Sequence, residues 1–183
     1  MKIGFSVATP DINTPLLPAQ QGPFGENLDV LAECGYDGVE VSLRNPKELD
    51  LEMIEKEVNR RKLEVAAIHT AAIGFQDKIW LCHPDQSIRE EAMLRLKGAI
   101  DFASSFEVGV IIGSFRGQLN TGDAREESIK WMYDAFKQGA EYAHKKGSKI
   151  LFEPQTRFSV NFGFTTQDGV KFAREIDSPG MGV

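Results

Sequence analysis

The chain is poor in cysteine and has no long apolar run. Its two cysteines, Cys34 and Cys82, are too few for a disulfide framework and do not form a CxxC pair. Reduced thiols are typical of the cytoplasm, so we expect a cytoplasmic protein. No apolar stretch reaches the roughly 18 residues that a membrane-spanning helix requires, and the N-terminus lacks the apolar segment of a signal peptide. A membrane partner is therefore not expected.

Positive charge is also scarce, because 21 Lys and Arg face 27 Asp and Glu and leave a net charge of −6. Non-specific affinity for DNA comes mostly from neutralising phosphates with Lys and Arg, so the acidic balance argues against a nucleic-acid partner. Neither GxGxxG nor GxxxxGK[ST] follows any apolar run, which disfavours a dinucleotide site and a P-loop. The length of 183 residues suits a single domain, residues 1–183.

Short runs rich in β-branched and other apolar residues recur along the chain and alternate with segments of helical periodicity. The predicted strands are residues 2–8, 37–43, 65–71, 108–114 and 149–153. The predicted helices are residues 51–61, 87–103, 129–143 and 166–177. Asp50 is the expected N-cap of the first helix, Ser87 and Glu90 form the expected capping box of the second, and Gly147 is placed to end the third.

Alternation of strand and helix predicts an α/β fold with parallel strands and right-handed crossovers. The strand starts are separated by 35, 28, 43 and 41 residues, and eight such units would take roughly 300 residues. We therefore favour a (β/α)₈ TIM barrel, with a Rossmann-like open sheet as the alternative. Residues 181–183 have the pattern of a sixth strand, so the chain is expected to be the N-terminal portion of a barrel. Open strand edges invite pairing with another chain, which predicts association or a homo-oligomer.

Catalytic groups of such barrels come from the carboxyl ends of the strands and from the loops that follow them. The polar candidates at the strand ends are Ser6, Glu40, His69, Ser114 and Glu153, and those in the following loops are Arg116, Arg157 and Asn161. Glu40 lies between Val39 and Val41 and so points to the face opposite the two valines. Glu153 ends a buried strand, where an isolated carboxylate is costly unless a cation, a metal or hydrogen bonds compensate it.

Each candidate also has a purely structural interpretation. Glu153 could pair with Arg157 four residues on, and Glu40 could be an interior carboxylate neutralised by a neighbouring Lys or Arg. His69 could simply be a hydrogen-bonded histidine at the barrel mouth, and Arg116 a solvated loop residue. The long segment 71–86 is either a lid that excludes water or an ordinary loop anchored by its two aromatic side chains.

The segment EPQTRFSVNFGFTT, residues 153–166, resembles the EPLNRYETNFLNT-type segment of a family of sugar isomerases and epimerases. These enzymes have a xylose isomerase-like TIM barrel and include hydroxypyruvate isomerase, hexulose-phosphate isomerases or epimerases, and ketose 3-epimerases. Further similar segments are GYDGVEV at 35–41, HPDQSIREEAMLRLKGAIDFA at 83–103 and IIGSFRG at 111–117. The resemblance thus spans nearly the whole chain.

The resemblance implies a divalent metal, Mn²⁺ or Mg²⁺ with Co²⁺ or Zn²⁺ as alternatives, held by Glu, Asp, His and Glu. Glu153 matches the first ligand and a catalytic acid/base, while the other three ligands would follow Val183. The implied reaction is proton abstraction next to the carbonyl of a sugar or sugar phosphate, through an enediolate. Ser6, Glu40, His69, Arg116, Arg157 and Asn161 are the expected substrate contacts. With one ligand of four, this chain is expected to be inactive alone.

Two departures from the family pattern leave other functions open. The family's Asn before the arginine is Thr156 here, and its Glu six positions after the metal ligand is Ser159. The loss of that Glu gives some support to a non-catalytic sugar-binding or scaffold barrel. A zinc apurinic endonuclease is a further alternative, because His69 lies where those enzymes place a zinc ligand. Ser114, however, stands where they have a further zinc histidine.

Overall fold

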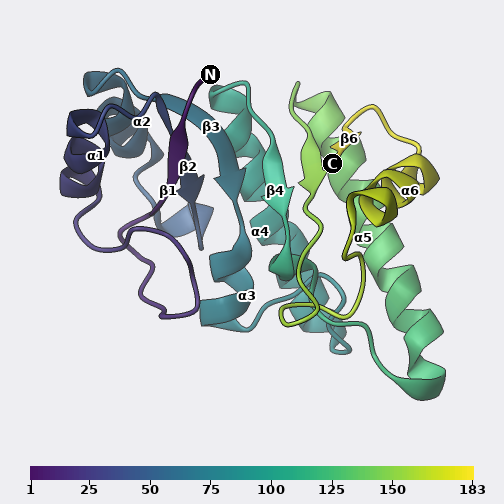
Figure 1. Ribbon diagram of the computed structural model, residues 1–183. Coiled ribbons are helices and arrows are strands. Elements are labelled where there is room, and N and C mark those ends of the chain that lie inside the picture. Colours follow the sequence, from purple (N-terminus) through teal and green to yellow (C-terminus); the bar gives the residue numbers. More distant parts are fainter.

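Six parallel strands form one sheet in the order β1-β2-β3-β4-β5-β6 in the computed structural model, which describes all residues 1–183 (Figure 1). The strands are β1 (Gly4–Ala8), β2 (Gly38–Ser42), β3 (Glu64–His69), β4 (Val110–Ile112), β5 (Ile150–Phe152) and β6 (Met181–Gly182). All five predicted strands are present, and the short sixth strand falls at 181–182 as expected. Each strand pairs in parallel with the next strand along the chain.

Helices connect successive strands. They are α1 (Phe24–Glu33), α2 (Leu51–Arg60), α3 (Ala71–Asp77), α4 (Gln86–Ser105), α5 (Arg125–Lys145) and α6 (Thr166–Ile176), with short 3₁₀ turns η1 (Pro46–Glu48), η2 (Ser114–Arg116) and η3 (Gly122–Ala124). The four predicted helices are confirmed as α2, α4, α5 and α6. Helix α1 was not predicted, and α3 occupies a segment that we expected to be a loop.

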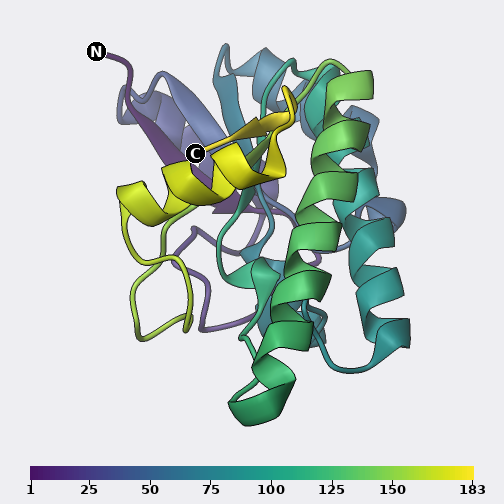
Figure 2. The same cartoon turned by 90° about the vertical axis from the view of Figure 1, so that its right-hand side faces the viewer.

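The two faces of the sheet have different surroundings. Side chains on one face are fully buried under the helices, namely Val7, Val39, Val41, Ile68, Val110, Ile112, Ile150 and Phe152. The register places Ser6 beside Glu40, and His69 beside Ile111, on the opposite face, where these side chains are only partly buried. Figure 2 shows α4 and α5 side by side on the same side of the sheet. Helices on one face and strands in sequential order are features of a barrel wall, so the Rossmann-like alternative is wrong.

Aromatic side chains hold β5 against α5 and α6. The Phe152 ring lies 5.7 Å from that of Phe136 and 4.9 Å from that of Phe172, measured between ring centroids. Phe136 and Phe172 meet edge to face at 4.9 Å. Such pairs add to the free energy of burial. The aromatic cluster therefore fixes the strand that ends at Glu153.

Local caps explain where several helices begin and end. Asp50 accepts a hydrogen bond from the Met53 N–H at 2.9 Å, which confirms it as the N-cap of α2. Gly147 follows α5 with φ of +72°, a left-handed conformation suited to glycine. The predicted capping box of α4 is wrong, because the helix begins earlier and Asp85 accepts from the Ser87 N–H at 2.8 Å.

The two cysteines lie in different environments, and neither forms a disulfide. Cys34 is exposed at the end of α1. Cys82 is buried and donates to the Gln118 carbonyl at 3.3 Å, and burial raises the pKa of its thiol to about 11. Among the helices, none combines the length and the apolar character needed to cross a membrane.

Candidate functional site

A cavity of about 270 Å³ lies at the carboxyl ends of the strands. Its polar lining comes from four strand ends and the loops after β4 and β5: Ser6, Glu40, His69, Ser114, Glu153, Gln155 and Ser159. In Figure 1 this edge of the sheet faces downwards, where α3 and the loops after β1, β4 and β5 gather. All five strand-end candidates from the sequence therefore meet in one place. Small-molecule sites usually occupy about 300–1,000 Å³, so this cavity suits a small ligand.

Glu153 is the carboxylate at the end of β5, and the sequence alone does not show which groups compensate its charge. Its N–H continues the sheet by donating to the Ile112 carbonyl at 3.1 Å. Its Oε2 accepts from Gln155 Nε2 at 2.5 Å and lies 3.8 Å from His69 Nε2. The side chain is 39% exposed, so the carboxylate remains reachable from the cavity. The hydrogen bond from Gln155, the nearby His69 and the charge of Arg116 thus compensate Glu153 within the site.

The pKa of Glu153 reflects opposing influences. Burial raises it, but the nearby His69 side chain, the hydrogen bond from Gln155 and the charge of Arg116 lower it by more. The pKa of this carboxyl consequently lies below its usual value. Glu153 is therefore ionised at neutral pH and able to accept a proton.

His69 joins Glu153 to a row of polar groups across the sheet. Its Nδ1 lies 3.4 Å from Ser42 Oγ, which lies 3.0 Å from Ser6 Oγ. Ser42 is fully buried and was not among the predicted site residues. The signal was present, because Ser42 shares the alternation of Glu40 two residues earlier. Strands β1, β2 and β3 thus contribute adjacent polar groups beside the carboxylate.

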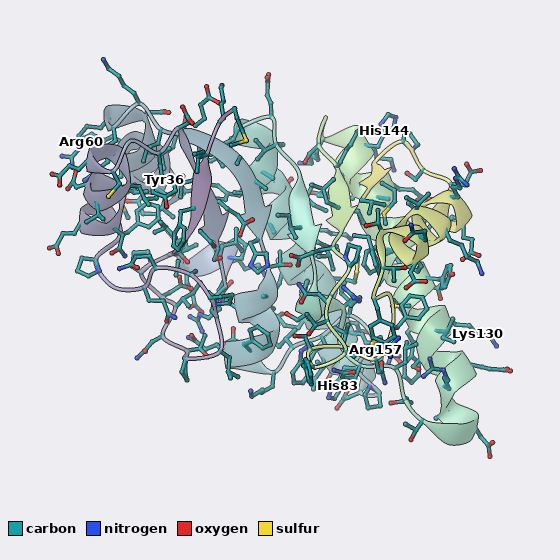
Figure 3. The ribbon with its side chains drawn as sticks, in the orientation of Figure 1. Tyr36, Arg60, His83, Lys130, His144 and Arg157 are labelled. Atoms are coloured by element: carbon teal, nitrogen blue, oxygen red, sulfur yellow. The ribbon has the colours of Figure 1, made fainter.

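Arg157 lies outside the cavity. Its guanidinium carbon is 5.3 Å from the centre of the Phe164 ring, and the residue is exposed. Figure 3 shows Arg157 at the same end of the molecule as His83, away from Arg60 and His144. Arg157 makes no ion pair with Glu153, so the interpretation of Glu153 as the partner of Arg157 is wrong.

Arg116 and Asn161 are also turned away from the cavity. Arg116 is only 1% exposed and donates to backbone carbonyls, so the expectation of a solvated loop residue is wrong. Asn161 exchanges two hydrogen bonds of 2.8 Å with the backbone of Leu119. Both side chains connect the loops that follow β4 and β5. Their predicted contact with substrate is not supported by this placement.

Ion pairs hold the wall of the cavity that α3 forms. Arg44 Nε lies 3.0 Å from Asp11 Oδ2, and Arg44 Nη1 lies 3.0 Å from Asp77 Oδ1. Arg95 Nη1 reaches the other oxygen of Asp77 at 3.1 Å. Phe75 lines the cavity, so the segment 71–86 contributes to the site. Since its helix is tied at Asp77, the structure favours an anchored segment over a lid.

The residues at the cavity fit a divalent cation only in part. Glu153 offers a carboxylate and His69 a ring nitrogen, both of which are common metal donors. No three His, Cys, Asp or Glu side chains gather in the chain in a way that would hold a metal ion. These residues therefore do not complete a metal site by themselves.

The fold and the cavity define a βα-barrel wall with a candidate active site at the carboxyl ends of its strands. The chain belongs to the xylose isomerase-like TIM barrel family, whose sequence model matches residues 28–183. A search of curated proteins gave no match.

Solved structures of related fold have low sequence identity. D-allulose 3-epimerase from Methylomonas sp. matches with a TM-score of 0.74 and 19% identity over 99% of this chain and 61% of the epimerase. AP endonuclease, family 2, from Brucella melitensis matches with a TM-score of 0.68 and 18% identity over 99% and 67% of the two chains. A xylose isomerase-like TIM barrel protein from Mycobacterium smegmatis in complex with magnesium gives a TM-score of 0.67 and 14% identity over 97% and 62%. This chain thus spans about three fifths of the epimerase.

Proposed function

We propose that the protein takes part in isomerising or epimerising a sugar by moving a proton at the carbon next to a carbonyl. The observation that carries this proposal is the ionised Glu153 carboxylate in a small cavity lined by strand-end polar groups. A carboxylate within hydrogen-bond reach of such a carbon can act as a general base. The similarity to sugar epimerases supports this reaction class.

The roles of the other cavity residues follow from their chemistry. Glu153 accepts the proton, which leaves an enediolate whose negative charge develops on the sugar oxygens. His69 lies beside Glu153 and provides a ring nitrogen from which a proton can be delivered or shared. Gln155 orients the carboxylate through its hydrogen bond, while Ser6 and Ser159 offer hydroxyls to the sugar. Glu40 supplies a second carboxylate in the same cavity.

Glu153 is also our proposed ligand for a divalent cation, Mn²⁺ or Mg²⁺. A carboxylate is a hard oxygen donor, and one related structure is a complex with magnesium. When bound, such a cation polarises carbonyl and hydroxyl oxygens as a Lewis acid. The cavity residues provide only part of the coordination that it needs.

The cavity is lined by two carboxylates, Glu40 and Glu153. The same acidic lining, together with the net charge of −6, disfavours the DNA substrate of an apurinic endonuclease.

Exchange of substrate hydrogen with solvent tests the proposed function. Full-length protein that carries the remaining barrel strands is incubated in D₂O with a panel of free ketoses and ketose phosphates, with and without Mn²⁺. We expect deuterium at the carbon next to the carbonyl of at least one of these sugars, detected by NMR. Binding of a sugar without any exchange would instead support a non-catalytic barrel. Cleavage of an abasic duplex would support the endonuclease alternative.

Gly113→Ala should impair this exchange more than it impairs folding. A Cβ at position 113 would overlap Glu153 Oε2 and lie 2.8 Å from Gln155 Nε2, so the carboxylate would have to move. A displacement of about 1 Å at a reacting group can cost about 100-fold in rate. Deuterium incorporation measures the loss of exchange rate, and the midpoint of urea denaturation measures the loss of folding stability.

Gly25→Ala is the matched control for that variant. Its added Cβ would lie 2.9 Å from Glu57 Oε2, another flexible carboxylate, on helices away from the cavity. We expect its exchange rate to stay near that of the unmodified protein. Equal rates for both variants would contradict the placement of Glu153 against Gly113.

A further inference from the structure

The side chain of Arg116 lies buried behind Glu153 and reaches three segments of the chain. Its Nη1 donates to the carbonyls of Gly113 and Glu153, each at 2.8 Å. Its Nη2 donates to the carbonyls of Phe162 and Gly163 at 3.0 and 3.1 Å. The guanidinium thus joins the end of β4, the end of β5 and the loop before α6.

A buried guanidinium without a carboxylate partner is unusual, because Arg is seldom fully buried unless it is paired. Arg116 makes no ion pair, and its Nε has no hydrogen-bond partner. Its cationic carbon lies 4.5 Å from the centre of the Phe152 ring. Burial lowers the pKa of Arg116 to about 10, which leaves the guanidinium protonated at neutral pH. The four carbonyl dipoles and the Glu153 charge therefore compensate it.

Other side chains connect the loops that follow β4 and β5, but none of them bonds the backbone of Glu153. Gln118 Nε2 donates to the Ser159 carbonyl at 2.7 Å. The side-chain amide of Asn161 accepts a hydrogen bond from the Leu119 N–H and donates one to the Leu119 carbonyl. Arg116 is the residue of this group whose side chain bonds the backbone of Glu153 directly.

We propose that Arg116 is a positioning residue, which holds the backbone of Glu153 so that its carboxylate is kept in place for proton transfer. This inference rests on the proposed function. A guanidinium provides donors in a rigid planar fork, whereas a lysine ammonium is a compact charge on a flexible stem. Lysine would keep the charge at position 116 but could not reproduce contacts with all four carbonyls.

Arg116→Lys and Arg116→Ala test this role through kcat and KM for deuterium exchange on the ketose identified above. We expect kcat to fall about 10- to 100-fold with KM little changed, because the reacting group is misplaced while the sugar contacts remain. Ethylguanidinium added to Arg116→Ala should restore part of kcat, and ethylammonium should not. A kcat equal to that of the unmodified protein in Arg116→Lys would overturn the proposal, whether or not Arg116→Ala folds.

Arg61→Lys is the matched control, because the Arg61 side chain is 5% exposed but pairs with Asp29 and Glu57 far from the cavity. A purely structural role of Arg116 would give both lysine variants the same kcat, and this result would also overturn the proposal.

Amide hydrogen exchange separates this inference from the proposed function. The Glu153 N–H donates to the Ile112 carbonyl, and we expect it to exchange faster in Arg116→Lys than in Arg61→Lys. If no sugar exchanges in the unmodified protein, the proposed function fails while this comparison still decides whether Arg116 holds Glu153. Unchanged protection of the Glu153 amide in Arg116→Lys would overturn the positioning role.

Discussion

Glu153→Gln is expected to slow solvent exchange at the substrate carbon by about 10²–10⁴-fold, the usual contribution of a general base. Glutamine keeps the size of the side chain and a carbonyl oxygen facing Gln155, but it cannot accept the proton. The loss should therefore appear in kcat more than in the binding of the sugar. Deuterium incorporation followed by NMR, together with sugar affinity from calorimetry, measures the two effects separately.

Glu55→Gln provides the comparison for that experiment. Glu55 lies on α2 and is exposed, so its replacement removes the same charge from a site without a role in the cavity. Its exchange rate should match that of the unmodified protein. If Glu153→Gln also exchanges at that rate, Glu153 is not the base, and the proton must be taken by another group such as Glu40 or His69.

Phe152→Ala is expected to cost about 3–5 kcal/mol of unfolding free energy, the range for a large aromatic core residue. Phe152 is fully buried, packs on Phe136 and Phe172, and supports the Arg116 guanidinium with its ring. Its removal leaves a cavity and weakens the support of a buried charge. Urea denaturation followed by circular dichroism measures the change.

Phe158→Ala removes an equal number of atoms from a side chain that is fully exposed. Its expected effect is within about 0.5 kcal/mol, as for most surface substitutions. A loss of similar size in the two variants would mean that the aromatic cluster does not carry the stability that its burial indicates.

The sequence predicted the sheet well because its strands are buried on one face and bounded by polar residues. It did not predict α1, which begins after Pro23 without a side-chain cap and contains Gly25 in its first turn. Helix α3 was not predicted for a different reason. It starts two residues after His69, so its first residue, Ala71, falls within the predicted strand 65–71, and Thr70 precedes it without forming a side-chain cap.

The candidate site was predictable where it depends on strand ends. The convergence of Glu40, His69 and Glu153 follows from parallel pairing alone. The surroundings of Arg116 do not, since its carbonyl acceptors include residues 37 and 47 positions away in the chain. Likewise, nothing in the local pattern indicates that Arg157 lies on Phe164 rather than beside Glu153.

The difference between the two thiols allows a fluorophore to be attached at one known position. Cys34 is exposed, whereas the Cys82 thiol is buried and is largely protonated at neutral pH. The thiolate is the form that reacts with maleimides, so a fluorophore added under native conditions is directed to Cys34. Because that residue follows α1 at the amino-terminal edge of the sheet, the dye is attached at the end of the molecule opposite the cavity.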